Sequence, residues 1–125
     1  MWVKANPNPQ NNEVPDCVVR ALSIAFNEDW YQIYDDLCAM GRYDCNMPSA
    51  DAVWGHYLKL RGCEPFTLPS SCPRCTTIRL FTRYYPRGIY IIGTGGHAVA
   101  VIDGNYFDSW DSGNEVPTFF WRVSK

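Results

Sequence analysis

A chain of 125 residues is long enough for one domain around a single hydrophobic core. Its composition, 46% hydrophobic and 19% charged residues, is ordinary for a globular protein, and a formal net charge of −2 argues against phosphate-backbone binding. We therefore expect no nucleic-acid partner. No segment looks like a signal peptide or a membrane span, which predicts a cytoplasmic protein without a membrane partner.

The chain begins with an Asn/Pro-rich segment, residues 1–16, that predicts an extended arm on a single domain over 1–125. Each residue before a proline is driven out of the helical region, so "NPNP" should run extended. Asp16 follows a proline and suits an N-cap, which predicts a helix beginning at Cys17. Its apolar face carries Val18, Ala21, Leu22 and Ala25.

Helical spacing predicts three further helices before residue 87. The second lies in "EDWYQIYDDLCAMG" and is expected to stop at Gly41. The third lies in "SADAVWGHYLKLRG", with Ser49 as its cap, and a short fourth helix runs from about Thr76 to Tyr84. The inner stripe of the second helix is expected to be Trp30, Ile33, Tyr34 and Leu37.

The last third of the chain changes to the pattern of strands. Asp103-Gly104 is a strong signal for a two-residue hairpin turn. Helices followed by an antiparallel sheet predict an α+β fold, in which N-terminal helices pack on a C-terminal antiparallel β-sheet. The expected strands lie in "GIYIIG", "HAVAVI", "NYFDSW" and "TFFWRV".

The hairpin sets which side chains share a face of the sheet. With a two-residue turn, Ile102 faces Asn105, and the pairing continues outward until Val99 faces Asp108. Side chains alternate along a strand, so His97 and Asp108 point to the same side as diagonal neighbours. A histidine and a carboxylate are therefore expected to meet on this face.

Cysteine, histidine and aspartate in this arrangement predict thiol chemistry. A helix N-terminus favours the thiolate of Cys17, while Asp16 raises its pKa unless that charge is spent on capping. A carboxylate fixes the tautomer of an imidazole and stabilises its charged form. We expect Cys17 as nucleophile, His97 as general base and acid, and Asp108 as the residue that orients His97; Asp111 falls on the other face.

These residues resemble the papain-like cysteine peptidase superfamily. The resemblance rests on a cysteine at a helix start, on His97-Ala98-Val99, and on Asp108-Ser109-Trp110, where Asp replaces the more usual Asn. It implies a papain-like fold and a cysteine hydrolase, acting as peptidase, amidase or isopeptidase on a peptide or protein through a thioester acyl-enzyme, with no cofactor and no metal. A transferase is equally compatible with the same three residues.

The resemblance also implies a donor for the oxyanion. The superfamily usually places a glutamine about six residues before the cysteine, and here Asn11 stands there, flanked by Gln10 and Asn12. Asn11 and the Cys17 backbone N–H would then form the oxyanion hole. One departure is that Val18 and Val19 follow the cysteine, where the superfamily has Gly and Ser or Trp.

A second resemblance keeps a different class of function open. The string "NPNP…DCVVRA…GHAVAVIDG…FDSWDSGNE" is similar to short proteins of phages and gut Firmicutes. A phage chain of this size would also suit a non-enzymatic binding or inhibitor protein on a papain-like scaffold. The two functions differ at the thiol, because only the enzyme needs a reachable Cys17 of low pKa.

The remaining cysteines are expected to be reduced, mostly structural thiols. "CPRC", from Cys72 to Cys75, has the spacing of half a zinc site or of a redox dithiol. It lacks a second close pair and a preceding strand, so a loop entering a helix is the favoured interpretation. His56, between aromatic residues of the third helix, is expected to be structural.

Overall fold

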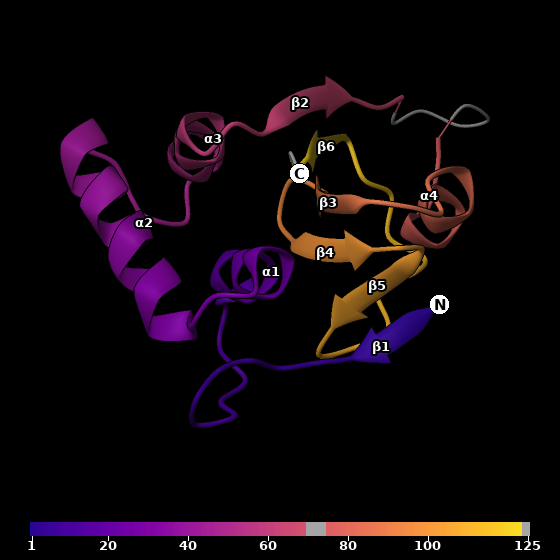
Figure 1. Cartoon of the computed structure of the whole chain (residues 1–125), viewed down its shortest axis with the longest axis horizontal. Helices are drawn as coiled ribbons and strands as arrows, with labels where there is room; N and C mark the ends of the chain where they lie inside the picture. Colours follow the sequence, from indigo (N-terminus) through magenta and orange to yellow (C-terminus); the bar gives the residue numbers. More distant parts are fainter. Residues whose placement is uncertain (70–74, 124–125) are drawn as a thin grey trace.

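The computed structural model describes residues 1–69 and 75–123 and has an α+β architecture (Figure 1). Within these residues, six strands form one mixed sheet in the order β1-β5-β4-β3-β6-β2. The helices are α1 (Cys17–Phe26), α2 (Trp30–Asp44), α3 (Asp51–Leu60) and α4 (Ile78–Tyr84). The strands are β1 (Trp2–Lys4), β2 (Glu64–Thr67), β3 (Ile89–Gly93), β4 (Ala98–Ile102), β5 (Asn105–Asp108) and β6 (Phe119–Arg122).

The sheet is not wholly antiparallel, because its first strand pairs in parallel with β5. The N-terminal arm was expected to be merely extended, but Trp2 Nε1 donates to the Asp108 carbonyl at 3.2 Å, and Ala5 N–H donates to the same oxygen at 2.9 Å. A strand of three residues is too short to show an alternating pattern in sequence. Strand β2 was also not expected; it is exposed, and its Pro65 is tolerated because the strand lies at an edge.

The hairpin between β4 and β5 forms in the predicted register. Asp103 and Gly104 have φ values of 48° and 81°, as a two-residue turn of this kind requires. Ile102 pairs with Asn105, and the register continues through Ala100 opposite Phe107 toward Val99 and Asp108. The prediction of the register is therefore confirmed.

The helix ends depart from the sequence predictions in detail. Helix α1 begins at Cys17 as expected, but the Asp16 side chain makes no capping hydrogen bond. Helix α2 continues past Gly41 and ends at Asp44, and the following residue, Cys45, adopts the left-handed conformation. Gly41 serves close packing instead, since a Cβ there would lie 2.8 Å from the Asn46 carbonyl oxygen. The residue before α3 is Ala50 rather than Ser49.

The predicted inner stripe of α2 is only half right. Ile33 and Leu37 are buried, whereas Tyr34 is 46% exposed and Trp30 is partly exposed. Tyr34 and Trp30 stack on each other with ring centroids 5.1 Å apart. Their rings therefore cover the outside of the helix pair instead of filling the core.

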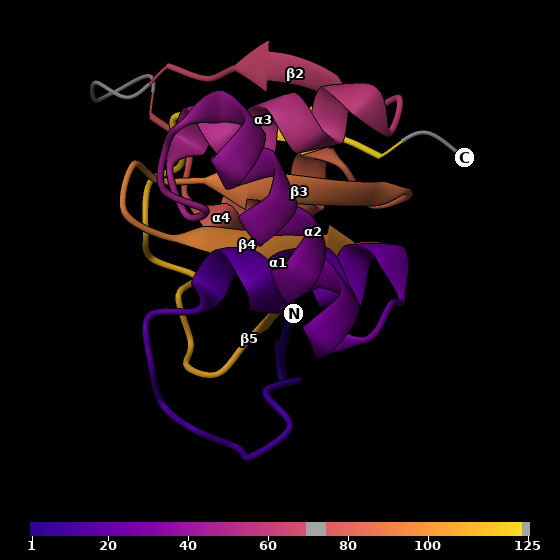
Figure 2. The same cartoon turned by 90° about the vertical axis from the view of Figure 1, so that its left-hand side faces the viewer.

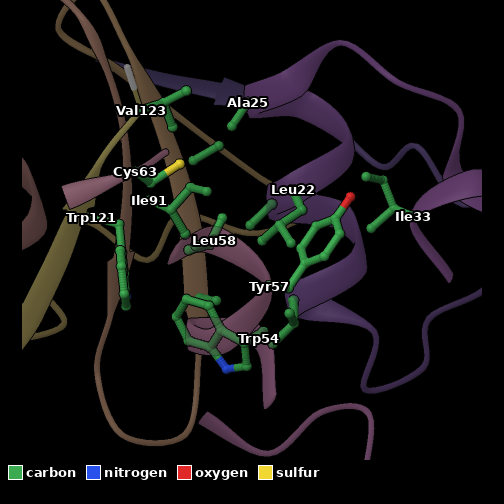
Figure 3. Close-up of a cluster of buried hydrophobic side chains, with 14 of the residues drawn as sticks. Leu22, Ala25, Ile33, Trp54, Tyr57, Leu58, Cys63, Ile91, Trp121 and Val123 are labelled. Atoms are coloured by element: carbon green, nitrogen blue, oxygen red, sulfur yellow. The ribbon is translucent and has the colours of Figure 1, made fainter. Parts of the chain in front are cut away.

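Two hydrophobic clusters lie on opposite faces of the sheet. Helices α1, α2 and α3 lie on one side of the sheet (Figure 2), and the larger cluster lies between them and the sheet (Figure 3). The smaller cluster lies under α4 on the other face. Helix α1 packs directly on β4, which brings its first residue close to the start of that strand. The larger cluster includes Leu22, Trp54, Leu58, Ile91 and Trp121.

The cysteines are not all reduced thiols. Cys75 is disulfide-bonded, so the expectation of a reduced thiol is wrong there, while Cys17, Cys38 and Cys45 are free. The expectation rested on an inferred compartment, which does not decide the state of one particular thiol. Cys72 lies outside the described residues. Within the described part of the chain, no helix is long and apolar enough to cross a membrane, and no three His, Cys, Asp or Glu side chains group as metal ligands.

Candidate active site

Three elements meet at one end of the β4–β5 hairpin. Cys17 is the first residue of α1, His97 immediately precedes β4, and Asp108 is the last residue of β5. The packing of α1 on β4 brings the cysteine to the histidine, and the hairpin register brings the histidine to the aspartate. The side chains of Cys17 and His97, 80 positions apart in sequence, therefore lie next to each other and next to Asp108.

The histidine binds the aspartate directly. His97 Nε2 lies 2.5 Å from Asp108 Oδ2, and the two side chains are 13% and 2% exposed. Asp111 lies away from this pair and instead contacts Arg79 and Tyr106. The parity of the two-residue turn accounts for this choice, because it places Asp108 and not Asp111 on the face of His97.

Two further groups hold the Asp108 carboxylate. The Ser109 backbone N–H donates to Oδ1 at 2.8 Å, and the Ser112 hydroxyl donates to Oδ2 at 2.6 Å. Ser112 is fully buried, and sequence reasoning missed it. The only signal was its place four residues after Asp108 in the turn "WDSGN". These donors leave Oδ2 fixed toward His97 and favour the ionised carboxylate.

The cysteine thiol meets the other side of the imidazole. Cys17 is hydrogen-bonded to the His97 side chain and to the Ala98 backbone N–H. Because Nε2 of the ring faces Asp108, Nδ1 is the nitrogen available to the thiol. The order thiol, imidazole and carboxylate is the one that thiol catalysis requires.

The environment favours charge on all three groups. Burial opposes the Cys17 thiolate, but hydrogen bonds from His97 and the Ala98 N–H outweigh it and lower the pKa of the thiol. Burial also opposes the imidazolium, but hydrogen bonds to Asp108 and Cys17 raise the pKa of His97 to about 9. For Asp108, burial raises the pKa, but the bonds from His97 and Ser112 lower it overall. These contacts therefore stabilise a thiolate beside an imidazolium relative to the isolated groups.

The Asp16 carboxylate binds other side chains and not the N-terminus of α1. Its carboxylate pairs with Arg20 and accepts hydrogen bonds from Asn8 Nδ2 at 3.1 Å and Trp30 Nε1 at 3.0 Å. Arg20 Nη2 also lies 3.5 Å from Asp108 Oδ1, and all three charged residues of this network are buried. Charges of opposite sign thus alternate from the Cys17 thiolate through to Asp16, and sequence reasoning did not find Arg20.

The start of α1 offers unpaired donors beside the thiol. Since Asp16 does not cap the helix, the backbone N–H groups of Cys17, Val18 and Val19 have no hydrogen-bond partner among the described residues. The first bond of the helix runs from Arg20 N–H to the Asp16 carbonyl. Such donors carry partial positive charge and suit an oxyanion.

Asn11, the donor implied by the papain-like resemblance, lies in a turn of the N-terminal arm. Its φ is 57°, and its side-chain oxygen accepts a hydrogen bond from Asn6 Nδ2 at 3.3 Å. The structure does not place it in the wall of either hollow that contains Cys17. Its role at the oxyanion stays a prediction.

Cys17 lies between two open hollows. One, of about 220 Å³, is bounded by the start of α3 and by the Gly95-Gly96 loop. The other, of about 360 Å³, is bounded by Glu13 and by Trp110, whose ring lies 5.2 Å from that of His97. A Cβ on either glycine would meet nothing within 4 Å, so this wall is open. The thiol is therefore reachable from both sides.

The chain matches no family model, and no curated protein or solved structure matches it. The geometry of this site therefore provides the basis for a function.

Proposed function

We propose that the protein is a cysteine hydrolase, a peptidase, amidase or isopeptidase, that acts through a thioester on Cys17. The observation that carries the proposal is the chain of contacts from the Cys17 thiol through His97 to Asp108, with the 2.5 Å bond between Nε2 and Oδ2. Burial of the pair and the open hollows on both sides of the thiol support it.

Acylation begins with attack of the Cys17 thiolate on the carbonyl carbon of an amide. The carbonyl oxygen becomes an oxyanion, which the backbone N–H of Cys17 and its helical neighbours stabilise, with the Asn11 amide as the donor implied by resemblance. His97 gives its Nδ1 proton to the leaving nitrogen, and the C–N bond breaks. The amine departs, and a thioester to Cys17 remains.

Deacylation reverses the proton transfer. Neutral His97 takes a proton from water, and the resulting hydroxide attacks the thioester carbonyl. The C–S bond breaks, the acid leaves, and the thiolate–imidazolium pair is restored. An amine in place of water would make the same site a transferase.

The arrangement also supports a papain-like assignment of the fold. The cysteine is the first residue of a helix that packs on the sheet, the histidine immediately precedes β4, and the aspartate ends the neighbouring antiparallel strand β5. The parallel pairing of β1 with β5 and the Val18-Val19 sequence after the nucleophile depart from the superfamily pattern. We propose the fold on the strength of the site and not of overall similarity.

An activated ester tests the proposal without knowledge of the natural substrate. We expect p-nitrophenyl acetate to release p-nitrophenolate with acetyl transfer to Cys17, detected by peptide mass mapping, and Cys17→Ala to abolish both. Cys45→Ala, which removes an exposed thiol away from the site, should change neither. A folded protein whose Cys17 is acetylated no faster than Cys45 would contradict the proposal and favour the binding or inhibitor alternative.

A further inference from the structure

A third hollow, of about 180 Å³, lies between α1 and α2, next to the residues that flank Cys17. No step of the acyl transfer uses it. Its walls are largely apolar and include Val18, Val19, Tyr34, Leu37, Cys38 and Pro48. We call it the α1–α2 hollow.

Fixed side chains build the outer wall of the α1–α2 hollow. The Tyr34 ring stacks on Trp30 with the two planes 18° apart. Trp30 Nε1 in turn donates to Asp16 Oδ2 at 3.0 Å. The exposed tyrosine ring is thereby tied to the residue that precedes the nucleophile.

Close packing of the loop after α2 builds the opposite wall. A Cβ at Gly41 would lie 2.8 Å from the Asn46 carbonyl oxygen and 3.2 Å from Pro48 N. Only glycine allows this approach, which holds Pro48 in the wall of the α1–α2 hollow. The hollow is therefore a formed feature of the packed helices and loop.

The α1–α2 hollow adjoins a hollow that contains Cys17. It shares Pro15, Val18 and Ser49 with the hollow of about 220 Å³ that contains Cys17. Asp16 also lines it, but that carboxylate is buried and already bound to Arg20. An apolar group can thus enter without a free charge nearby, whereas a charged group would be desolvated without a partner.

Resting on the proposed function, we propose that the α1–α2 hollow binds an apolar side chain of the acyl substrate, on the residue that carries the attacked carbonyl. An apolar cavity of about 150 Å³ is large enough for benzene, so this hollow accepts an aromatic or branched aliphatic side chain. The substrate class is therefore a peptide-like amide with a large apolar residue at the cleaved bond.

Chloromethyl ketones separate this inference from the proposed function. The thiolate of Cys17 displaces chloride and forms a C–S bond, so no hydrolysis is needed. We expect the N-acetyl-phenylalanine reagent to alkylate Cys17 about tenfold faster than the N-acetyl-glycine reagent, because burial of one apolar side chain is worth roughly that factor. Equal rates at a reactive Cys17 would overturn the inference and leave the proposed function intact.

A filled hollow provides the second arm of the test. Cys38→Phe places a ring in the α1–α2 hollow and should reduce the ratio of the two rates to about one. The matched control is Ala39→Phe, which adds the same ring at the exposed next position of α2 and should keep the ratio. Val19→Phe fills the same hollow from the side of α1 and replaces Cys38→Phe in the test if that variant does not fold.

The outcomes of this test are distinct. An unchanged ratio in a folded Cys38→Phe or Val19→Phe variant would show that the side chain binds elsewhere. Failure of the proposed function would look different, since Cys17 would then react no faster than exposed Cys45 with either reagent.

Discussion

The two histidines of the chain each bind an aspartate, yet their surroundings differ. His56 Nδ1 lies 2.9 Å and 3.0 Å from the two oxygens of Asp44, and this pair joins α3 to the end of α2. Its side chains are 35% and 21% exposed, against 13% and 2% for His97 and Asp108. Water therefore weakens the electrostatic attraction in the pair of His56 and Asp44 more than in the pair of His97 and Asp108.

The other neighbours of the two rings differ as well. The ring near His56 is the exposed Tyr43, 6.2 Å away, whereas His97 faces the thiol of Cys17 at a helix N-terminus. A histidine–aspartate contact alone therefore says little about reactivity. Burial together with a nucleophile on the second nitrogen distinguishes the candidate site from the structural pair.

The largest effect should come from removing each histidine in turn. His97→Ala should slow alkylation of Cys17 by iodoacetamide at pH 7 by roughly ten- to hundredfold, since each unit of thiol pKa changes the thiolate fraction about tenfold. His56→Ala should leave the rate unchanged. Peptide mapping after brief labelling measures the Cys17 alkylation rate in both variants. Equal slowing in the two variants would contradict the distinction between a site histidine and a structural histidine.

A smaller effect should follow from the aspartates. Asp108→Ala should lower the pKa of His97 from about 9 and slow Cys17 alkylation several-fold, because the imidazolium loses its partner. Asp44→Ala and Asp111→Ala should do neither. NMR titration of the His97 ring protons follows the pKa, and a shift in Asp111→Ala with none in Asp108→Ala would contradict the observed register.

Removal of Arg20 tests the charges behind the buried pair. Arg20→Gln leaves the Asp16 carboxylate next to Cys17 without a cationic partner, which should raise the thiol pKa and slow alkylation about two- to fivefold. The double variant Asp16→Asn/Arg20→Gln removes both charges and should recover most of the rate. A double variant as slow as the single one would mean that the Asp16 charge does not reach the thiol.

The smallest effect concerns stability against pH. The folded pKa of His97, about 9, lies above its ordinary value of 6.5, so protonation stabilises the folded protein fully below about pH 6.5. That contribution is lost as the pH rises through about 9. Urea unfolding measures the free energy of unfolding of wild type and of His97→Ala. The difference between the two free energies should shrink from pH 6 to pH 9.5. A difference that grows over this range would mean that folding lowers the pKa of His97 and does not raise it.

Local rules explain which parts of the fold were predictable from sequence. The hairpin register followed from one two-residue turn and from alternation, and that register placed Asp108 on the face of His97. The helix at Cys17 followed from the preceding proline and the apolar spacing. The edge strands β1 and β2 were not predicted, because β1 has only three residues and β2 has four residues that are all exposed.

Contacts across long sequence separations explain what was missed. Arg20 reaches Asp108, 88 residues away, and no local pattern encodes that contact. Asp16 looks like a helix cap in sequence, but its carboxylate instead binds the buried Arg20 guanidinium and the Trp30 indole N–H. The Ser112 hydroxyl likewise reaches Asp108 only because the turn after β5 folds back.

The pH dependence of Cys17 alkylation tests the central claim most directly. We predict that its rate rises at a lower pH than the rate of an ordinary thiol, whose pKa is about 8.5, and changes again near pH 9 as His97 loses its proton. Cys45, labelled in the same samples, is the internal reference. A Cys17 profile that coincides with that of Cys45, or a rate below it throughout pH 5 to 10, would contradict the account.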